Sequence, residues 1–325
     1  MQPPESSSRV SASVYRTDRL RLRHLRLLQL IDRRGSLGSA ARELGVSQPA
    51  ATLLLRELEA VFESRLVERG PRGGRLTTAG ALALERLTIA LVSVERALEA
   101  ARAPASEPVL RIGCIQVVGV EMLPAALKRL ERAAAPGRIR IREGRARDLV
   151  AALCAGELDC VIGWMDEAVA QGQPVAQLEI EPLRHGRMQV VAAPTHPLAR
   201  RRGVPAAELA RWRWIVPPPE SRTHAAFLRL FLANGMAAPP VTIECAALHT
   251  MLHLVAQSRF LAVAPDAAVR AYARRGMVAA LKGPALDLGR DTVSLLTRRD
   301  GATLPAVARF RKALLATDYR RRTTL

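Results

Sequence analysis

The sequence predicts a mainly helical N-terminal domain that contains a winged helix-turn-helix, then one long helix, then a two-lobed α/β domain. Three patterns predict this organisation. Residues 20–79 are basic and follow helical spacing, residues 79–102 carry a long apolar stripe with no glycine after Gly80, and from Val109 short apolar strands alternate with helices. We therefore expect five segments: a disordered leader (1–19), the helix-turn-helix domain (20–78), the long helix with a hinge (79–106), the α/β domain (107–317) and a basic tail (318–325).

Length and charge limit the classes of protein to which the chain can belong. The 325 residues are 49% hydrophobic, which suffices for two or three packed domains. The formal net charge of +19 favours a polyanionic partner, because each Lys or Arg beside a phosphate releases condensed counterions. An arginine-rich composition can also reflect coding bias, so the charge alone does not identify nucleic acid as the partner.

The N-terminal sequence and the cysteines favour a cytoplasmic protein with no membrane partner. The first residues, MQPPESSSRVSASVYR, lack the apolar core of a signal peptide, and no later run approaches the ~20 apolar residues that span a bilayer. The four cysteines form no CxxC pair and lack the spacing of a small secreted domain, as expected in a reducing compartment.

The segment Ser36–Glu59, SLGSAARELGVSQPAATLLLRELE, predicts two short helices joined by a tight turn at Gly45 and Val46. Ser36 and Ser47 are expected to cap the two helices, and Pro49 stands in the first turn of the second helix, where a missing N–H costs little. In a basic chain, this arrangement places the start of the second helix in the major groove of DNA.

Three side chains are expected on the exposed face of that second helix, each about one turn after the previous one. Gln48 can contact adenine, Thr52 can touch a thymine methyl or a phosphate, and Arg56 can reach guanine or the backbone. The stretch from Val67 to Thr77 predicts a two-stranded wing whose Arg72 and Arg75 lie near the flanking backbone or minor groove. The alternative for the whole segment is a small helical bundle with a solvated basic face.

The long helix carries an apolar stripe that needs a partner surface. The stripe recurs at steps of three and four residues and comprises Leu84, Leu87, Leu91, Val94 and Leu98. One interpretation packs it on its own domain. We favour pairing with a second copy of the helix, because the polar stretch ARAPASEP comes directly after it and is typical of a hinge.

The α/β alternation predicts a parallel sheet with helices on both faces, folded into two lobes. We assign residues 107–182 and 267–317 to lobe I and residues 183–266 to lobe II, with chain crossings near 164–183 and 264–266. Ligands of such sheets bind at strand carboxyl ends facing the crevice. The residues expected to bind a ligand there are Gln116, Val117, Val118, Gly119, Trp164, Ser221, Arg222, Thr223, His249 and Thr250.

Within that cleft, Ser221, Arg222 and Thr223 suit a carboxylate or phosphate, because two hydroxyls and a guanidinium meet at a helix start. A plain N-cap beside a surface arginine is the competing interpretation.

The sequence offers little support for a metal, a redox pair or catalysis. Cys245, His249 and His253 recur every four residues, but the predicted strand VTIEC ends at Cys245, which breaks the helical register, so we expect no metal site. Cys154 and Cys160 fall in apolar segments and are interpreted as buried thiols. No GxSxG, HExxH, GxxxxGK[ST] or GxGxxG motif occurs, so we expect no enzyme activity and no cofactor.

The chain resembles LysR-type transcriptional regulators. The segments AARELGVSQPAAT, LRELE and ERGPRGGRLTTAG carry the resemblance most specifically, and VLRIG, MLP, GELDCVIG, HPLA and FLAVAPD occur in the order that family shows, over residues 20–317. The resemblance implies a type-2 periplasmic-binding-protein fold for the α/β domain, a linker helix that dimerises, and frequently a tetramer on two spaced DNA sites.

Two departures from the family pattern concern the expected sites. Leu53 and Leu54 stand where the family often has a basic or polar residue; Leu53 can contact thymine methyls or pack against a neighbouring element or partner subunit. Gln116 stands in the loop where many members present a Ser or Thr hydroxyl to an acidic effector, so the effector is expected to be less acidic or bound differently.

The sequence therefore predicts a transcriptional regulator that binds double-stranded DNA and is modulated by a small-molecule effector of unknown identity. We expect a homodimer or homotetramer, with RNA polymerase as a further partner. The first alternative is an architectural DNA-binding protein whose second half only assembles oligomers. The second is an enzyme fused to a DNA-binding head, which predicts turnover of the ligand.

Overall fold

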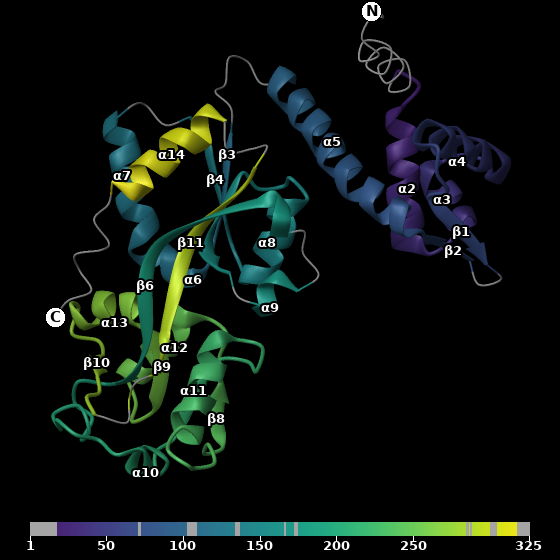
Figure 1. The fold of residues 1–325 in the computed structure, drawn as a ribbon. Coiled ribbons are helices and arrows are strands. Elements are labelled where there is room, and N and C mark those ends of the chain that lie inside the picture. The colour runs from purple at the N-terminus through teal and green to yellow at the C-terminus, as the bar shows by residue number, and fades with distance from the viewer. Residues whose placement is uncertain are drawn as a thin grey trace, which may run out of the picture. The chain divides into compact units, whose positions relative to one another are not determined.

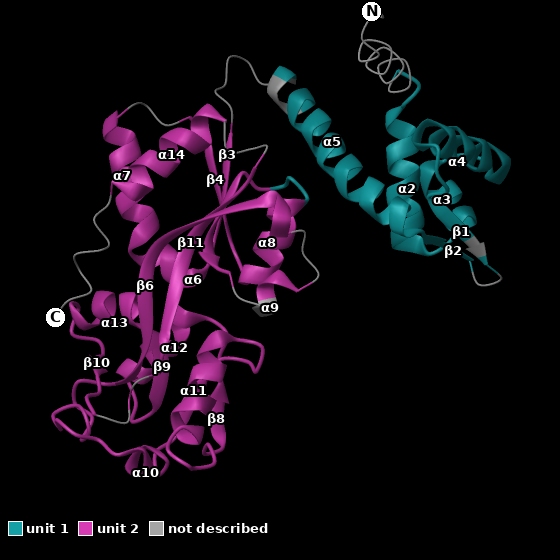
Figure 2. Ribbon diagram, viewed as in Figure 1, with its two compact units in different colours: residues 1–106, 155–157 teal, residues 107–154, 158–325 magenta. Residues whose placement is uncertain are grey.

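The computed structural model describes residues 18–70, 73–102, 109–133, 137–165, 167–171, 175–283, 286, 288–299 and 304–316. The chain divides into two compact units, residues 1–106 with 155–157 (unit 1) and residues 107–154 with 158–325 (unit 2) (Figure 2). Residues 1–17 of the expected leader, the hinge at 103–106, Arg72 and the expected tail lie outside the described residues.

Unit 1 contains the helix-turn-helix and its wing (Figure 1). Its elements are α2 (Leu22–Arg34), α3 (Leu37–Leu44), α4 (Gln48–Phe62), β1 (Val67–Gly70), β2 (Gly73–Leu76) and α5 (Thr78–Arg102). Helices α2, α3 and α4 share one core, in which Leu28, Ile31, Ala41, Leu55 and Leu58 are at most 1% exposed. The short helices are therefore held by packing rather than by helix propensity alone.

Glycine conformation fixes the two turns and the wing. Gly35 and Gly45 end α2 and α3 in the left-handed region, where an L side chain is disfavoured. Gly73 has φ +123°, and a Cβ there would stand 2.2 Å from the Gly35 carbonyl oxygen. The Gly74 N–H donates to that same carbonyl at 2.9 Å. The wing is thus attached to the turn that precedes α3.

Helix α5 packs its first half on its own unit, which corrects the expectation that the whole stripe serves a partner. Leu87 and Leu91 are buried in the core that α2 and α4 share, and Leu84 packs against the same core. Val94 and Leu98 are 36% and 52% exposed. The apolar residues therefore recur at one spacing along the whole helix, but only those in its first half are covered by the unit 1 core. Those in the second half are exposed.

Unit 2 begins with a three-layer arrangement of lobe I (Figure 1). The elements in chain order are β3 (Leu110–Cys114), α6 (Gln116–Val120), α7 (Met122–Ala133), β4 (Ile139–Glu143), α8 (Ala146–Cys154), β5 (Cys160–Trp164), α9 (Glu167–Ala170) and the 3-10 turn η1 (Val175–Gln177). Strands β4, β3 and β5 are parallel neighbours. The apolar side chains of β3 and β5 are covered by the helices between the strands, whereas β4 is largely exposed.

The chain then enters lobe II and returns. This part contains β6 (Leu178–Ala192), α10 (Ala206–Leu209), β7 (Trp214–Val216), α11 (Arg222–Leu232), β8 (Val241–Glu244), α12 (Leu248–Ala256), β9 (Leu261–Pro265), α13 (Asp266–Ala273), β10 (Ala279–Ala280), β11 (Arg290–Arg298) and α14 (Pro305–Leu315). Trp214, Phe227 and Phe231 pack with tilted and edge-to-face rings in the lobe II core.

The sheet is mixed, which corrects the expected parallel sheet. The strand order is β4-β3-β5-β11-β6-β9-β7-β8, with β10 beside β6. The long strands β6 and β11 run side by side along unit 2 (Figure 1) and are antiparallel to each other, and β11 is also antiparallel to β5 and β6 to β9. These two strands connect the lobes, so their directions are set by the crossing and not by a βαβ unit.

The return to lobe I occurs later than the sequence indicated. Residues 267–317 were assigned to lobe I, but Leu281 and Leu288 pack in the lobe II core with Trp214. Strand β10 also pairs with Val191 and Ala192 at the lobe II end of β6. The second connection is therefore β11. Ala267, Ala268 and Tyr272 of α13 pack in the cluster that contains the lobe I strands. The misplaced part of the assignment is therefore residues 279–288, which no change of pattern in the sequence separates from β11.

Candidate functional site

The helix-turn-helix begins both of its helices with the expected serines. Ser36 Oγ accepts the Ser39 N–H at 3.2 Å, and Ser47 Oγ accepts the Ala50 N–H at 3.4 Å. Pro49 lies in the first turn of α4, where it breaks no helical hydrogen bond. The free N–H groups and positive end of α4 are therefore presented at the surface, where a phosphate can bind.

The expected DNA-reading residues lie on the solvent side of α4. Gln48 and Arg56 are exposed and Thr52 is half-buried, whereas Leu55 and Leu58 point into the core. Their spacing of four residues places Gln48, Thr52 and Arg56 along one face of the helix. A Cβ at Gly38 would stand 3.9 Å from Gln48 Oε1, so the Gln48 side chain lies beside the start of α3.

The two leucines of α4 that depart from the family pattern have different surroundings. Leu54 is half-buried and packs against the unit 1 core. Leu53 is 58% exposed. Leu54 therefore packs against its own unit, whereas the exposed Leu53 is available for contact with DNA or with a partner.

Exposed arginines surround this face. Arg42 and Arg56 of the motif helices and Arg75 of the wing are exposed and form no ion pair with any residue that the structure describes. Arg34 is instead paired with Glu43 at 2.5 Å, and this hydrogen bond lowers the pKa of the Glu43 carboxyl. The unpaired guanidinium groups can bind phosphates without first leaving a carboxylate.

Two side chains that sequence reasoning missed hold α4 in place. His24 of α2 is 1% exposed; its Nδ1 accepts the Arg21 N–H at 3.2 Å and its Nε2 lies 3.0 Å from Glu57 Oε2. Glu59 Oε1 accepts the N–H groups of Leu66 and Val67 at 2.8 and 3.2 Å, which attaches the wing strand to α4. The His24–Glu57 and Glu59–Leu66 partners are 33 and 7 residues apart, so no local spacing indicates them.

In unit 2 the structure brings Trp164 and Arg222 together, as expected for residues of one cleft. The Arg222 guanidinium carbon lies 5.4 Å from the centre of the Trp164 ring. Arg222 Nη2 also donates to Asp291 Oδ1 on β11, a partner that the sequence did not suggest. Ser221 Oγ accepts the His224 N–H at 3.0 Å and so acts as the N-cap of α11, while Thr223 is half-buried.

The side chain of Gln116, the first residue of α6, caps the start of another helix, α12. Its Oε1 accepts the Leu248 N–H of α12 at 3.2 Å, and α12 has no side-chain cap from its own N-cap residue, Ala247. This contact joins the β3–α6 turn of lobe I to a segment between β8 and β9. The amide oxygen of Gln116 therefore takes the place that an anion or hydroxyl would fill at this helix end.

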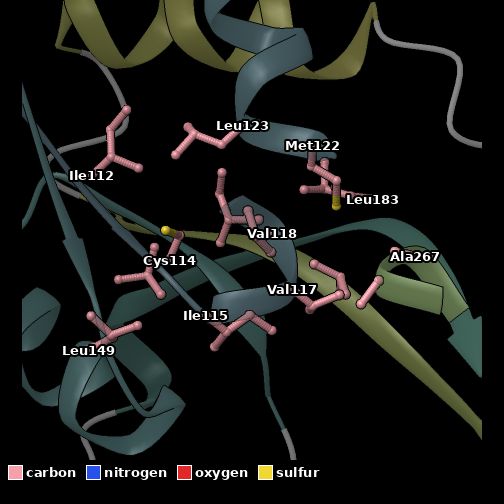
Figure 3. Close-up of a cluster of buried hydrophobic side chains, with 14 of the residues drawn as sticks. Ile112, Cys114, Ile115, Val117, Val118, Met122, Leu123, Leu149, Leu183 and Ala267 are labelled. Carbon is pink, nitrogen blue, oxygen red and sulfur yellow. The ribbon is translucent and has the colours of Figure 1, made fainter. Parts of the chain in front are cut away.

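The remaining expected cleft residues separate into three groups. Val118 is fully buried (Figure 3), so its assignment as a ligand contact is wrong; α6 turns this side chain into the lobe I core. Val117 lines a cavity, and Gly119 is half-buried. His249 and Thr250 are exposed on α12, and His249 Nδ1 bonds to the Tyr272 hydroxyl of α13.

A cavity with about 380 Å³ of empty space, part of it open to solvent, lies where the two lobes meet. Its apolar walls include Val117, Met122, Trp164, Met188 and Val293, and Gly186 of β6 and Asp291 of β11 also line it. A bulge between Val293 and Ser294 disturbs the β6–β11 register at this point. The sequence predicted a cleft between the lobes, and two of its expected residues, Val117 and Trp164, line this cavity. The other lining residues come from elements far apart in the chain, so the sequence did not indicate them.

Beside the cavity lies a buried group of four charges, which we call the hinge network: Glu121, Arg184, Asp266 and Arg270. Arg184 lies 3.1 Å from Glu121 and 2.8 Å from Asp266, and Arg270 lies 3.2 and 2.7 Å from the same two carboxylates. Arg184 and Asp266 have side chains only 5% and 7% exposed. Each charge in the network has an oppositely charged partner, and this pairing offsets the free-energy cost of removing the charges from water.

The described residues contain no group of three or more His, Cys, Asp or Glu side chains placed to hold a metal ion. Cys114, Cys154 and Cys160 are buried and form no disulfide with a described residue, and burial raises the pKa of Cys114 to about 11. Buried thiols of this kind are unreactive, as the sequence indicated for Cys154 and Cys160. Of the helices described, none has the length and apolar character that a bilayer crossing requires.

A capped helix-turn-helix with a wing, together with a separate two-lobed α/β unit that encloses a cavity, defines a ligand-responsive DNA-binding regulator. The chain belongs to the LysR family of bacterial regulators: residues 22–81 match the lysR-family regulatory helix-turn-helix domain, and residues 105–318 match the LysR substrate binding domain. It is a transcriptional regulator with a DNA-binding and an effector-binding domain.

Two related proteins support this membership, and a solved structure shares the fold. The chain is 30% identical over 305 residues to the SDS degradation transcriptional activation protein of a Pseudomonas species, covering 92% of this chain and 97% of the relative. It is 27% identical over 287 residues to the uncharacterized HTH-type transcriptional regulator YdcI of Escherichia coli, covering 87% and 91%. A solved full-length variant of OxyR from Pseudomonas aeruginosa has a similar fold, with TM-score 0.59, 21% identity and coverage of 93% and 97%.

Proposed function

We propose that the chain acts as a homodimer that recognises a two-fold symmetric DNA site with the first turns of α4. Binding of a small molecule between the lobes of unit 2 then changes how the dimer contacts this DNA site. One observation carries the DNA-reading part: Gln48 and Arg56 stand exposed in the first and third turns of a helix whose start is capped by Ser47 and free of acidic residues. Such a surface suits both phosphate and base edges.

The dimer in this proposal forms through the exposed half of α5. Val94 and Leu98 continue the stripe that begins in the unit 1 core, and both are exposed. Exposed apolar side chains four residues apart favour pairing with a second amphipathic helix. Two such dimers on spaced sites would give a tetramer, and RNA polymerase is the expected partner of the DNA-bound form.

The proposal involves no catalysis and no cofactor; the ligand is bound and released unchanged. The relatives named above are transcriptional regulators, which agrees with this part of the proposal. We also propose a cytoplasmic location, because the DNA partner of a bacterial regulator lies there. An enzyme fused to a DNA-binding head would instead consume its ligand.

The main alternative is an architectural protein whose +19 net charge binds phosphates without regard to sequence. Competition binding of the full-length protein separates the two. We expect DNA from the region upstream of its own gene to resist scrambled competitor of equal length and composition at about 0.15–0.2 M salt, by roughly a thousandfold in affinity. Equal competition by both DNAs, with a steep salt dependence for each, would establish the architectural alternative.

A further inference from the structure

Lobe II carries a group of exposed arginines around an open groove, at the end of its sheet where β6 ends and β7 and β9 begin. We propose that this groove binds a nucleoside diphosphate or triphosphate, with the base against Trp212 and the phosphates on Arg211 and the neighbouring arginines. The groove is separate from the cavity between the lobes, so this inference goes beyond the proposed function and does not rest on it.

Strand directions bring three segments of the chain to this end of lobe II. Strands β7 and β9 are parallel and β6 is antiparallel to β9, so the end of β6 lies beside the starts of β7 and β9. Helix α10 also lies at this end, at the bottom of Figure 1. The segment after β6, the segment before β7 and the segment before β9 together contribute six exposed arginines: Arg200, Arg201, Arg202, Arg211, Arg213 and Arg259.

These arginines are not balanced by carboxylates. Residues 193–213 contain five arginines and a single acidic residue, Glu208. Glu208 pairs with Arg201, and the other five arginines of the group form no ion pair with any residue that the structure describes. Coding bias raises the number of arginines along a whole chain, but it does not explain this local shortage of carboxylates. Guanidinium groups gathered in this way favour a ligand with several negative charges, and their planar forks match phosphate oxygens.

The groove gives such a ligand a place to bind. It has a volume of about 510 Å³ and is open to solvent, and its walls are Pro205, Ala207, Glu208, Arg211 and Trp212. This volume lies within the ~300–1,000 Å³ that is typical of small-molecule sites. A DNA duplex carries its phosphates on a convex surface and would contact only the rim of the groove. The groove therefore favours a small phosphorylated molecule over duplex DNA.

Trp212 is held in place as an aromatic wall of the groove. The ring of His196, which is 3% exposed, packs against the Trp212 ring with 4.2 Å between the ring centroids. His196 Nδ1 accepts the Leu198 N–H at 3.1 Å, which fixes the imidazole. Burial lowers the pKa of His196, so the imidazole adds no further positive charge behind the tryptophan at neutral pH. A fixed, half-buried tryptophan beside arginines is suited to stacking of a nucleobase.

The two parts of the groove together define the class of ligand. Trp212 accounts for a flat aromatic ring, and Arg211 with Arg200 and Arg202 accounts for more than one phosphate. Adenosine alone would leave the arginines without an anion, and pyrophosphate alone would leave the tryptophan without a stacking partner. A nucleoside with two or three phosphates satisfies both parts.

The proposal predicts the effects of variants at the groove. Arg211→Gln is expected to weaken nucleotide binding at least tenfold, because a charge-assisted hydrogen bond is lost. Trp212→Leu is expected to weaken it at least fivefold, whereas Trp212→Phe keeps an aromatic face and should stay within about threefold of wild type. The double variant Arg200→Gln/Arg202→Gln is expected to weaken binding severalfold.

The test is calorimetry on the full-length protein without DNA, at about 0.15 M salt, with ADP, GDP, adenosine and pyrophosphate as separate ligands. Arg309→Gln is the matched control, because Arg309 is also exposed and forms no ion pair within the described residues, but lies on α14 in lobe I. Circular dichroism selects folded variants. Arg211 is exposed, so its variant keeps the test informative if Trp212→Leu unfolds.

The expected result is that ADP or GDP binds at least tenfold more tightly than both adenosine and pyrophosphate, and that Arg211→Gln and Trp212→Leu lose this binding while Arg309→Gln keeps it. Binding of neither nucleotide up to about 1 mM would overturn the proposal, as would equal affinity for pyrophosphate or unchanged nucleotide binding by Arg211→Gln.

A second measurement distinguishes the groove from a DNA-binding surface. We expect Arg211→Gln to bind a short duplex of scrambled sequence as tightly as Arg309→Gln does. If Arg211→Gln weakens duplex binding and leaves nucleotide binding unchanged, the arginines serve DNA and the proposal is wrong. Either failure would leave the proposed function intact, because sequence-specific DNA recognition and the cavity between the lobes involve other residues.

Discussion

Replacing Gly73 by alanine tests whether the wing is fixed by its attachment to the turn before α3. The added Cβ would stand 2.2 Å from the Gly35 carbonyl oxygen, well inside contact distance, so β2 must move away. The move breaks the 2.9 Å hydrogen bond from Gly74 to that carbonyl, which costs about 0.5–1.5 kcal/mol. A side chain at φ +123° adds roughly 1–2 kcal/mol of backbone strain.

Together these terms predict a loss of about 1.5–3.5 kcal/mol in local stability. Hydrogen exchange of the full-length protein measures it directly: amides of residues 73–76 should exchange at least tenfold faster, and DNA affinity should fall severalfold because Arg75 is displaced. Gly38→Ala is the matched control, since a Cβ there meets nothing closer than 3.9 Å and alanine favours the helix. Unchanged protection of β2 in Gly73→Ala would refute the reasoning.

Three further predictions concern base reading, assembly and thiol chemistry. Gln48→Ala should relax preference at one base position by ~1–3 kcal/mol in binding-site selection, whereas equal weakening on every sequence would show that Gln48 touches only phosphate. Leu98→Asp should shift the protein toward monomer in analytical ultracentrifugation, because a charge then enters the proposed α5 pairing; an unchanged dimer would place the interface elsewhere. At pH 8, a thiol reagent should label the half-buried Cys245 well before Cys114, and labelling of Cys114 should rise as pH approaches its raised pKa of about 11; comparable rates at pH 8 would contradict the burial.

Features that depend on neighbouring residues were predictable from the sequence. The caps Ser36 and Ser47 and the turn at Gly45 act within three or four residues, so their pattern predicts the bounds of α3 and α4 directly. The α/β alternation likewise predicted the elements of unit 2. Periodicity alone did not indicate which surface the α5 stripe contacts, so Leu87 and Leu91 were assigned to a partner when they serve their own core.

Features that depend on distant residues were not predictable. Arg222 and Asp291 are 69 residues apart, and Arg184 meets carboxylates 63 and 82 residues away. Their meeting depends on β6 and β11 running antiparallel between the lobes, a direction that strand composition does not encode. The sequence thus indicated Arg222 as a cleft residue but gave no sign of the carboxylate that already occupies it.

Footprinting on the DNA upstream of its own gene, with and without a panel of candidate metabolites, tests both DNA reading and ligand response. We expect protection of a two-fold symmetric site in both conditions, with the protected length shortening or shifting when one metabolite of the panel is present. Uniform protection of all DNA, or a footprint that no metabolite changes, would contradict it.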